Sequence, residues 1–199
     1  VFGVLLAWVL VRYRFPGRSL LEALFVLAAR DRVNVMTIRG SYAGALGMPQ
    51  FMPSSWLKFA VDFDEDGRVD LHRSVADVVG SVANFLSVHG WQRDLPTHFD
   101  VLPPPEGPDR EALLAPDILP SFKAADMAAR GATLSPAGQQ FAGPLALVEL
   151  RNGVEPPSFV AGTGNFWTIT RYNWSAYYAM AVIDLADTLS ALKLVADQR

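Results

Sequence analysis

The acidic stretch VDFDEDGRVD, residues 61–70, limits the fold of this chain more than any other feature. Three aspartates stand at alternate positions, and Gly67 follows them at a point where a sharp turn is needed. Carboxylates at this spacing can point into one concavity, as they do in calcium-binding loops of the EF-hand pattern. A backbone carbonyl at the seventh position supplies a further ligand. The pattern therefore predicts a calcium site formed by Asp62, Asp64, Asp66 and the carbonyl of Arg68.

The loop departs from the usual pattern at its end. A bidentate glutamate normally closes such a loop at the twelfth position, but counting from Asp62 leads to Arg73. Asp77 is the nearest acidic residue beyond Asp70, which makes it the candidate for the closing carboxylate. Asp77 also has the spacing of a helix cap, and the two roles are compatible. The alternative to a metal site is a solvated acidic turn, which is a common structure.

Two segments have the spacing of a capping box and predict the starts of helices. They are residues 19–22 and residues 74–77, and an apolar run follows each of them. The second run places valines, a phenylalanine and a leucine at helical spacing from Val75 to Leu86, and it stops at Gly90. Glu22 is therefore expected to have a structural role at the start of the first helix.

The middle of the chain has a different character. Five prolines between residues 95 and 108 mark a lobe boundary or an extended connector. PLALVEL, residues 144–150, and NFWTITRY, residues 165–172, have the β-branched and aromatic residues typical of strands. A last helix with Ser175 as its N-cap follows. The expected class is α+β and mainly α, with a helical core and calcium loop (residues 1–94), a small β-containing lobe (95–164), and a return to the core with the C-terminal helix (165–199).

The composition excludes several kinds of function. At 51% hydrophobic and 19% charged residues, the chain is of the ordinary globular type. A formal net charge of −3 without a basic cluster argues against a nucleic-acid surface. The absence of cysteine excludes disulfides, thiolate metal sites and cysteine nucleophiles. The opening VFGVLLAWVLV is too short for a membrane span, so a buried helix is favoured over the core of a signal peptide.

Two further segments have the composition of a sugar-binding surface. Residues 40–56, GSYAGALGMPQFMPSSW, combine small residues, hydroxyls, aromatic rings and the amide of Gln50. Amides and hydroxyls can bind sugar hydroxyls while aromatic rings stack on sugar faces, although ordinary packing is the alternative explanation. Residues 170–182, TRYNWSAYYAMAV, crowd tyrosines and Asn173 at a junction before a helix. For this second segment the pattern alone favours capping and half-buried core edges.

Three segments occur together in an order that is informative. They are GSYAGALGMPQFMPSSW, AVDFDEDGRVDLHRSVADVVGSVANFLSVHGW and NFWTITRYNWSAYYAMAV. Together they resemble the lytic murein transglycosylase B family, whose members cleave the glycan strands of bacterial peptidoglycan. The resemblance extends from about Leu20 to Leu189 and matches least in the proline-rich middle. It implies a lysozyme-like helical core, a small β lobe and an EF-hand-like loop whose structural calcium is closed by Asp77.

The resemblance also implies a set of glycan-binding residues. The family places a serine, a glutamine, two tyrosines and an asparagine in its cleft, and a tyrosine where this chain has Phe85. Phenylalanine at that position keeps a stacking face and lacks the hydroxyl. The expected substrate-binding residues are Ser41, Gln50, Phe85, Tyr172, Asn173 and Tyr178.

The catalytic glutamate of the family has no counterpart in this sequence. The family carries it in a Gly-Val-Glu-Thr/Ser motif, ahead of a stretch that RFPGRS, residues 14–19, resembles. The family's glutamate would therefore lie before Val1, and very weak or no lytic activity is expected of this chain. The alternatives are a non-catalytic peptidoglycan-binding or scaffolding module and, less favoured, a calcium-dependent adhesion module.

The resemblance further implies a cellular setting. The expected partners are peptidoglycan glycan strands and no nucleic acid, and the expected location is the periplasm. Membrane attachment through a segment ahead of Val1 is an option that the resemblance leaves open. The chain is expected to be a monomer.

Overall fold

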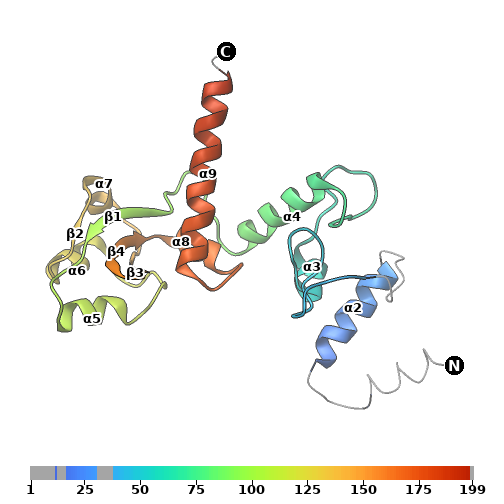
Figure 1. Cartoon of the computed structure of the whole chain (residues 1–199), viewed down its shortest axis with the longest axis horizontal. Coiled ribbons are helices and arrows are strands. Elements are labelled where there is room, and N and C mark those ends of the chain that lie inside the picture. Colours follow the sequence, from blue (N-terminus) through green and yellow to red (C-terminus); the bar gives the residue numbers. More distant parts are fainter. Residues whose placement is uncertain (1–11, 13–16, 31–37, 198–199) are drawn as a thin grey trace. The chain divides into compact units, whose positions relative to one another are not determined.

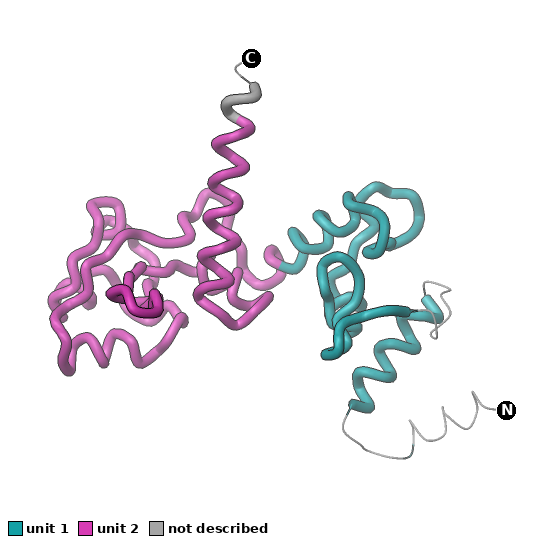
Figure 2. The backbone as a smooth tube through the Cα atoms, viewed as in Figure 1, with its two compact units in different colours: residues 1–85 teal, residues 86–199 magenta. Residues whose placement is uncertain are grey.

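A computed structural model describes residue 12 and residues 17–30 and 38–197. The chain divides into two compact units, residues 1–85 (unit 1) and residues 86–199 (unit 2), shown in different colours in Figure 2. Each unit is described by itself below. The predicted buried helix at residues 1–11 lies outside the described residues. The three-part division of the chain at residues 94 and 164 stays a prediction.

Unit 1 is helical. It contains α2 (Arg18–Arg30) and α3 (Pro53–Phe59), which pack against each other, and most of α4 (Val75–Val88) (Figure 1). The predicted cap at Ser19 is wrong, because α2 begins ahead of it at Arg18 and Leu21 donates to the carbonyl of Gly17. Glu22 makes no capping box, because its carboxylate pairs with Arg18 one turn away at 2.8 Å.

Helix α4 confirms the second predicted helix. Ser74 accepts a hydrogen bond from the backbone N–H of Asp77, which caps the first turn, and Gly90 ends the helix with φ of 100°. The buried face of α4 is not the valine stripe. Val75 and Val79 are exposed, and the buried positions of this helix are Asp77, Gly80, Ser81 and Phe85.

Unit 2 is built around a small antiparallel sheet (Figure 1). The sheet has the strand order β2-β1-β4-β3, so β3 is one of its edges. Alternate residues of β3 are buried on opposite faces of the sheet, which explains why PLALVEL is almost continuously apolar. The strands are β1 (His98–Leu102), β2 (Thr133–Leu134), β3 (Ala146–Asn152) and β4 (Glu155–Gly162).

Two hydrophobic cores lie on the two faces of this sheet. Leu147 of β3 belongs to one core with residues of α5 and α6, and Val148 belongs to the other with residues of α8 and α9. The predicted strand at 144–150 and the predicted helix after Ser175 are therefore confirmed. The helices of this unit are α5 (Pro108–Leu114), α6 (Ala124–Ala129), α7 (Pro136–Gln140), α8 (Gly164–Thr170) and α9 (Ala176–Asp197).

The predicted strand at residues 165–172 is wrong, because this segment forms helix α8. Thr163 caps the helix by accepting a hydrogen bond from the N–H of Asn165 at 3.1 Å. The β-branched residues fit the helix because two threonines bond to the backbone of the preceding turn. Thr168 donates to the carbonyl of Gly164 at 2.9 Å, and Thr170 donates to that of Trp167 at 2.7 Å.

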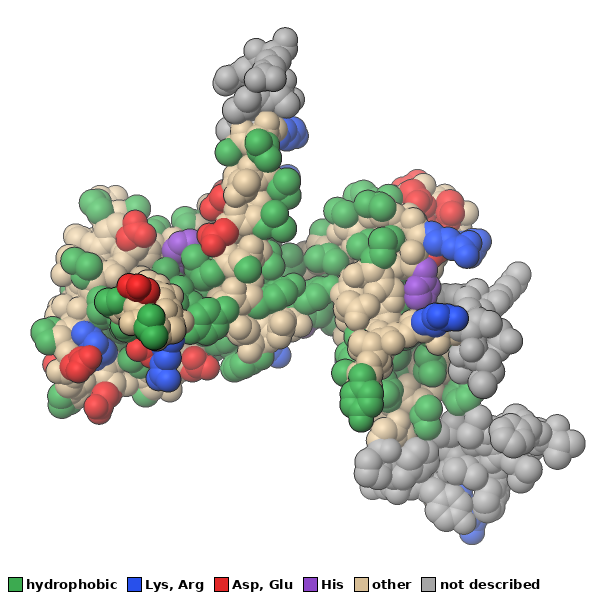
Figure 3. Space-filling model, in the orientation of Figure 1, with side chains coloured by type: hydrophobic (Ala, Val, Ile, Leu, Met, Phe, Trp, Pro, Cys, Tyr) green, Lys and Arg blue, Asp and Glu red, His purple; other side chains and the backbone are tan. Residues whose placement is uncertain are grey.

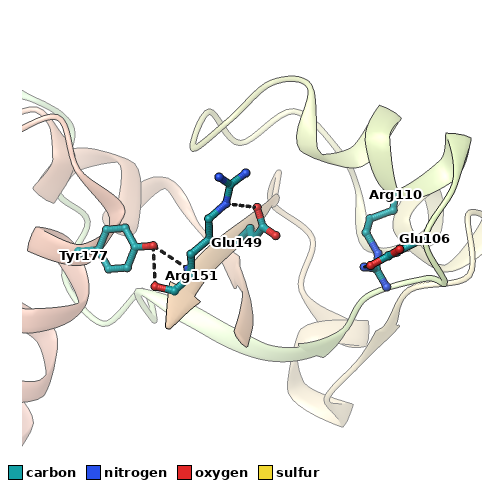
Figure 4. Close-up of polar contacts among 5 residues, drawn as sticks. All are labelled: Glu106, Arg110, Glu149, Arg151 and Tyr177. Atoms are coloured by element: carbon teal, nitrogen blue, oxygen red, sulfur yellow. Dashed lines mark hydrogen bonds and ion pairs between the residues drawn. The ribbon is translucent and has the colours of Figure 1, made fainter. Parts of the chain in front are cut away.

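Helix α9 is fastened to β3 through Tyr177 (Figure 4). The Tyr177 hydroxyl accepts from the N–H of Arg151 at 2.6 Å and donates to its carbonyl at 2.9 Å. The β3–β4 register shifts between Leu150 and Asn152, where Arg151 alone stands opposite Pro156 and Pro157, so the extra residue of the bulge lies on β4. Tyr177 therefore bonds to both backbone groups of Arg151 at the position opposite the bulge.

The described residues contain eight helices and four strands, which confirms the predicted α+β class with helix predominating. Among these helices, none combines the length and the apolar character that crossing a bilayer requires.

Candidate functional site

The acidic loop brings together three of the predicted metal ligands. Side-chain oxygens of Asp62, Asp64 and Asp77 all lie within 4.8 Å of one another. Asp62 and Asp64 come from the loop itself, whereas Asp77 comes from the first turn of α4. The sequence places Asp77 well beyond the usual closing position, and the fold returns it to the other two carboxylates. This arrangement is suited to a divalent cation with oxygen ligands.

Asp77 is the structural centre of this loop. Its side chain is 1% exposed, and its two oxygens accept hydrogen bonds from the N–H groups of Phe63 and Asp70, each at 2.8 Å. These two residues flank the acidic turn on either side. A single buried carboxylate therefore ties both arms of the loop to α4.

Asp66 and Arg68, the other two residues predicted to supply ligands, are joined to each other by a hydrogen bond within the loop. Among the described acidic residues, Asp66 is not a member of the three-carboxylate group, and its Oδ1 accepts from the N–H of Arg68 at 2.8 Å. Asp62 accepts from the N–H of Gly67 at 2.8 Å, which fixes the turn where Gly67 has φ of 87°. The roles of Asp66 and of the Arg68 carbonyl as metal ligands stay predictions.

Ser41 and Gln50 lie on one tight loop of unit 1. Leu46 pairs with both Gly40 and Phe51 in antiparallel bridges, so the chain folds back on itself and brings the two ends of the loop together. Ser41 and Gln50 are both exposed. Ser41 Oγ accepts from the N–H of Ala45 at 3.1 Å, which leaves the hydroxyl hydrogen available to another partner.

Gln50 has a strained backbone. Its φ is 52°, a left-handed conformation that side chains other than glycine adopt rarely. Its amide nitrogen donates to the carbonyl of Gly47 at 2.8 Å, which orients the side chain and leaves its carbonyl oxygen accessible. Strain of this kind is concentrated at functional sites, where the surrounding structure enforces it.

Phe85 is placed differently from the expected sugar-stacking ring. Its side chain is 7% exposed, and its ring meets the rings of Phe51 and Phe59 at centroid distances of 5.8 Å and 5.0 Å. Because Phe51 directly follows Gln50, Phe85 supports the Gln50 loop from inside unit 1. Contact between Phe85 and a sugar is untested.

Tyr172 and Tyr178 form a stacked pair in unit 2. Their ring centroids are 6.2 Å apart and their planes differ by 7°. Burial raises the pKa of Tyr172 from 10.0 to about 12, with a smaller contribution from Tyr178, and burial also raises the pKa of Tyr178. Asn173 is exposed beside the pair, while Ser175 caps α9 by accepting from the N–H of Tyr178. Both tyrosines are therefore neutral hydroxyl donors at physiological pH.

The raised pKa of Tyr172 predicts a loss of stability in alkali. The unfolded chain loses this proton near pH 10.0 and the folded chain near pH 12, so the folded state binds more protons between these values. The contribution is present below pH 10.0 and is lost as the pH rises through about 12. Urea unfolding at a series of pH values is expected to show a shallower decline for Tyr172→Phe than for the parent. Equal slopes would contradict the assignment.

The sequence reasoning missed one cluster near this pair. The guanidinium of Arg171 lies over the rings of Trp167 and Trp174, at 5.2 Å and 5.7 Å from their centroids. Trp167 belongs to α8, whereas Arg171 and Trp174 lie in the turn after it, so no helical spacing in the sequence could have identified this cluster. The predicted binding residues thus form two groups, Ser41, Gln50 and Phe85 in unit 1, and Tyr172, Asn173 and Tyr178 in unit 2.

Comparisons with known proteins match most of the chain. The family model described as Transglycosylase SLT domain matches residues 4–187. The membrane-bound lytic murein transglycosylase B of Escherichia coli is 34% identical over 183 residues, covering 87% of this chain and 46% of that protein. This chain therefore spans about half the length of that relative. The sulfate transport system permease protein CysT of Escherichia coli is 70% identical over 27 residues only, 14% of this chain and 10% of that protein.

Solved structures give the same result. Soluble lytic transglycosylase SltB1 from Pseudomonas aeruginosa has a TM-score of 0.77 and 33% identity, covering 91% of this chain and 60% of that one. Escherichia coli Slt35, in complex with calcium, has a TM-score of 0.76 and 32% identity, with coverages of 89% and 54%. Pseudomonas aeruginosa SltB3, in complex with NAG-anhNAM-pentapeptide, has a TM-score of 0.73 and 30% identity, with coverages of 92% and 48%. The chain shares the lysozyme-like fold of these proteins.

Proposed function

The chain belongs to the Transglycosylase SLT domain family, and on this basis we propose that it binds peptidoglycan glycan strands as part of a lytic murein transglycosylase. Enzymes of this kind cleave the β-1,4 bond between MurNAc and GlcNAc and close a 1,6-anhydro ring. The observation that carries the proposal is the exposed Gln50, which a rigid loop holds in a left-handed conformation. SltB3, which shares this fold, was solved with NAG-anhNAM-pentapeptide.

Unit 1 contributes the first group of proposed glycan contacts. The carbonyl oxygen of Gln50 and the hydroxyl of Ser41 are free to bond sugar hydroxyls, because the local bonds described above use only one polar atom or lone pair of each. Both side chains are held by these local bonds before a ligand arrives, which lowers the entropic cost of binding. Phe85 supports this loop through Phe51, so its proposed contribution is positioning.

Unit 2 contributes the second group. Tyr172 and Tyr178 present flat rings and neutral hydroxyls, and Asn173 presents an exposed amide. Rings of this kind stack on the apolar faces of sugars, while the hydroxyl and amide groups bond to sugar hydroxyls. Tyrosine hydroxyls keep their protons at neutral pH, and burial, which raises the pKa of both tyrosines, extends this range further into alkali.

The proposed cofactor is calcium with a structural role. Asp62, Asp64 and Asp77 would hold the ion, with Asp66 and the Arg68 carbonyl as further oxygen ligands. The residues present fit a hard cation, because three carboxylates lie close together and one of them is buried on a helix. Calcium there would neutralise the crowded carboxylates and brace the loop against α4. The Slt35 structure in complex with calcium supports this choice of metal.

The proposed activity of this chain on its own is very weak or absent. A glutamate that acts as general acid in this kind of reaction is protonated because an apolar environment buries it. None of the six glutamates in this sequence is buried. Glu22 and Glu149 are ion-paired with Arg18 and Arg151. This observation favours a second candidate function, a non-catalytic peptidoglycan-binding or scaffolding module.

Replacing Gln50 with glycine tests the proposal. Glycine relieves the left-handed strain and removes one local hydrogen bond, so the free energy of unfolding is expected to change by less than about 1 kcal/mol. Loss of the amide is expected to weaken binding to purified murein sacculi about five- to tenfold, measured by co-sedimentation. Gln140→Ala, an exposed glutamine on α7, serves as the control.

The same incubations distinguish the two candidate functions. Mass spectrometry of the soluble fraction is expected to detect few or no 1,6-anhydromuropeptides. Abundant 1,6-anhydromuropeptides would show that another acid substitutes for the family's glutamate. Sacculus binding that Gln140→Ala and Gln50→Gly alter equally would refute the role of the Gln50 loop.

The proposed setting follows from the substrate. Peptidoglycan lies in the periplasm of bacteria with an outer membrane, so we assign the chain to that compartment as a monomer. One relative is named membrane-bound and another is named soluble. Both a membrane-attached and a soluble protein are compatible with this location.

A further inference from the structure

Unit 1 contains a cavity that the proposed glycan contacts do not use. Its volume is about 730 Å³, which is within the range of small-molecule binding sites. Neither Ser41 nor Gln50 lines it. Its apolar lining includes four buried residues from α2, the Gln50 loop and α3, and these are Leu27, Ala28, Leu46 and Trp56.

Trp56 gives the first indication of a ligand. The side chain is 3% exposed, and its Nε1 is the one buried side-chain polar atom without a hydrogen-bond partner in the described part of the chain. An indole N–H can only donate, so its missing partner must be an acceptor. Buried donors are almost always satisfied in native proteins, and an exception calls for an explanation. The His72 ring lies 5.3 Å from the Trp56 ring and also lines the cavity.

The charges around the cavity give the second indication. Four arginines line it, and basic side chains and a histidine lie together on the face of unit 1 visible in Figure 3. Guanidinium groups bind carboxylates through paired, charge-assisted hydrogen bonds. The four are Arg30, Arg39, Arg68 and Arg73.

The acidic residues at the cavity do not cancel this charge. Asp70 accepts from the N–H groups of His72 and Arg73, both at 3.0 Å, and Asp62 accepts from the N–H of Gly67 at 2.8 Å. Both carboxylates are therefore engaged by the backbone of their own loop. Arg30 makes an interaction of its own, so three arginines are set against these two aspartates, and the lining residues keep one net positive charge.

We propose that this cavity binds a small carboxylate that carries an apolar chain, such as the free end of a short peptide. The apolar part lies against the floor formed by Leu27, Leu46 and Trp56, and the carboxylate accepts from the arginines at the rim. An oxygen of the ligand accepts from the Trp56 indole. The proposal is independent of glycan binding, since it uses other residues.

The indole N–H of Trp56 is a direct reporter for this site. In ¹⁵N–¹H spectra, N-acetyl-alanyl-leucine is expected to shift the Trp56 Nε1–H resonance downfield, because a hydrogen bond forms to a previously unpaired donor. The C-terminal amide of the same peptide, which lacks the negative charge and has an NH2 donor in place of one acceptor oxygen, is expected to leave it nearly unmoved. Trp56→Phe assigns the resonance by removing it.

Charge-removing variants test the rim. Arg39→Gln and Arg73→Gln are each expected to weaken peptide binding about tenfold, whereas Arg93→Gln, an exposed arginine in unit 2 with the same charge change, is expected to have no effect. Octanoate, a short fatty acid, also combines a carboxylate with an apolar chain and represents a lipid ligand. Tighter binding of octanoate than of the peptide supports the site and assigns it to fatty acids, while the reverse assigns it to peptides.

Three outcomes would overturn the proposal. The first is an unmoved Trp56 resonance with both peptide and octanoate at millimolar concentration. The second is an equal shift with the peptide acid and the peptide amide. The third is binding that Arg39→Gln, Arg73→Gln and Arg93→Gln leave equally unchanged.

Discussion

Replacing Asp77 with alanine is expected to lower the free energy of unfolding of unit 1 by about 3–5 kcal/mol, even without metal. The substitution removes the buried acceptor that the N–H groups of Phe63 and Asp70 share, and with it two partly buried hydrogen bonds. Each buried, unpaired donor costs about 1–3 kcal/mol, and a small cavity adds to the loss. Urea unfolding measures the total, and faster hydrogen exchange at the Phe63 and Asp70 amides would locate it.

Calcium separates the two roles of the acidic loop. Added calcium is expected to raise the melting temperature of the parent. At one hundred times the dissociation constant, bound calcium stabilises the folded state by about 2.7 kcal/mol. Asp64→Asn, at an exposed position, is expected to lose this response while keeping most of the metal-free stability. Asp77→Ala should lose both. A calcium response in Asp77→Ala equal to that of the parent would remove Asp77 from the proposed ligands.

Replacing Asn165 with leucine is expected to destabilise unit 2 by about 3–5 kcal/mol. The Asn165 side chain is fully buried and makes three hydrogen bonds to the backbone of residues 92–95. Its Oδ1 accepts from the N–H of Gln92 at 2.8 Å, and its Nδ2 donates to the carbonyls of Gln92 and Leu95, both at 2.7 Å. Leucine has a similar size and pairs with none of these groups.

A second asparagine provides the matched control for this prediction. Asn152 is exposed in the β3–β4 hairpin, so water can replace its partners, and Asn152→Leu is expected to cost less than about 1 kcal/mol. Urea titration of both variants, followed by tryptophan fluorescence, gives the comparison. If the two variants lost similar amounts of stability, Asn165 would not be the fastening point of the segment at 92–95.

Local patterns predicted the parts of the fold that local physics determines. The Asp-x-Asp-x-Asp-Gly turn, the helix that starts near Ser74 and the Ser175 cap all depend on neighbouring residues, and each is found where it was expected. The segment 165–172 was mistaken for a strand because its threonines and aromatics have strand propensity. Burial of Thr168 and Thr170 and their bonds to the preceding turn override that propensity.

The candidate site depends on contacts that spacing along the chain cannot give. Asp77 accepts hydrogen bonds from the amides of Phe63 and Asp70 because the loop folds back on α4. The sequence pattern identified Asp77 as a candidate ligand but could not predict these two bonds. The packing of Phe85 against Phe51 and Phe59 could not be predicted from one helix either, because those rings come from separate segments. The unpaired Nε1 of Trp56 belongs to the same class of tertiary effects.

The double hydrogen bond between Tyr177 and Arg151 has a consequence for solubility. As an edge of the sheet, β3 would offer unpaired N–H and carbonyl groups to a strand of another molecule. At one end of this edge, Ser121 and Phe122 bond to Leu145, and at the other end the Tyr177 hydroxyl bonds to both backbone groups of Arg151. The Tyr177 hydroxyl thus blocks the addition of another strand at this edge, and with it the aggregation that would follow.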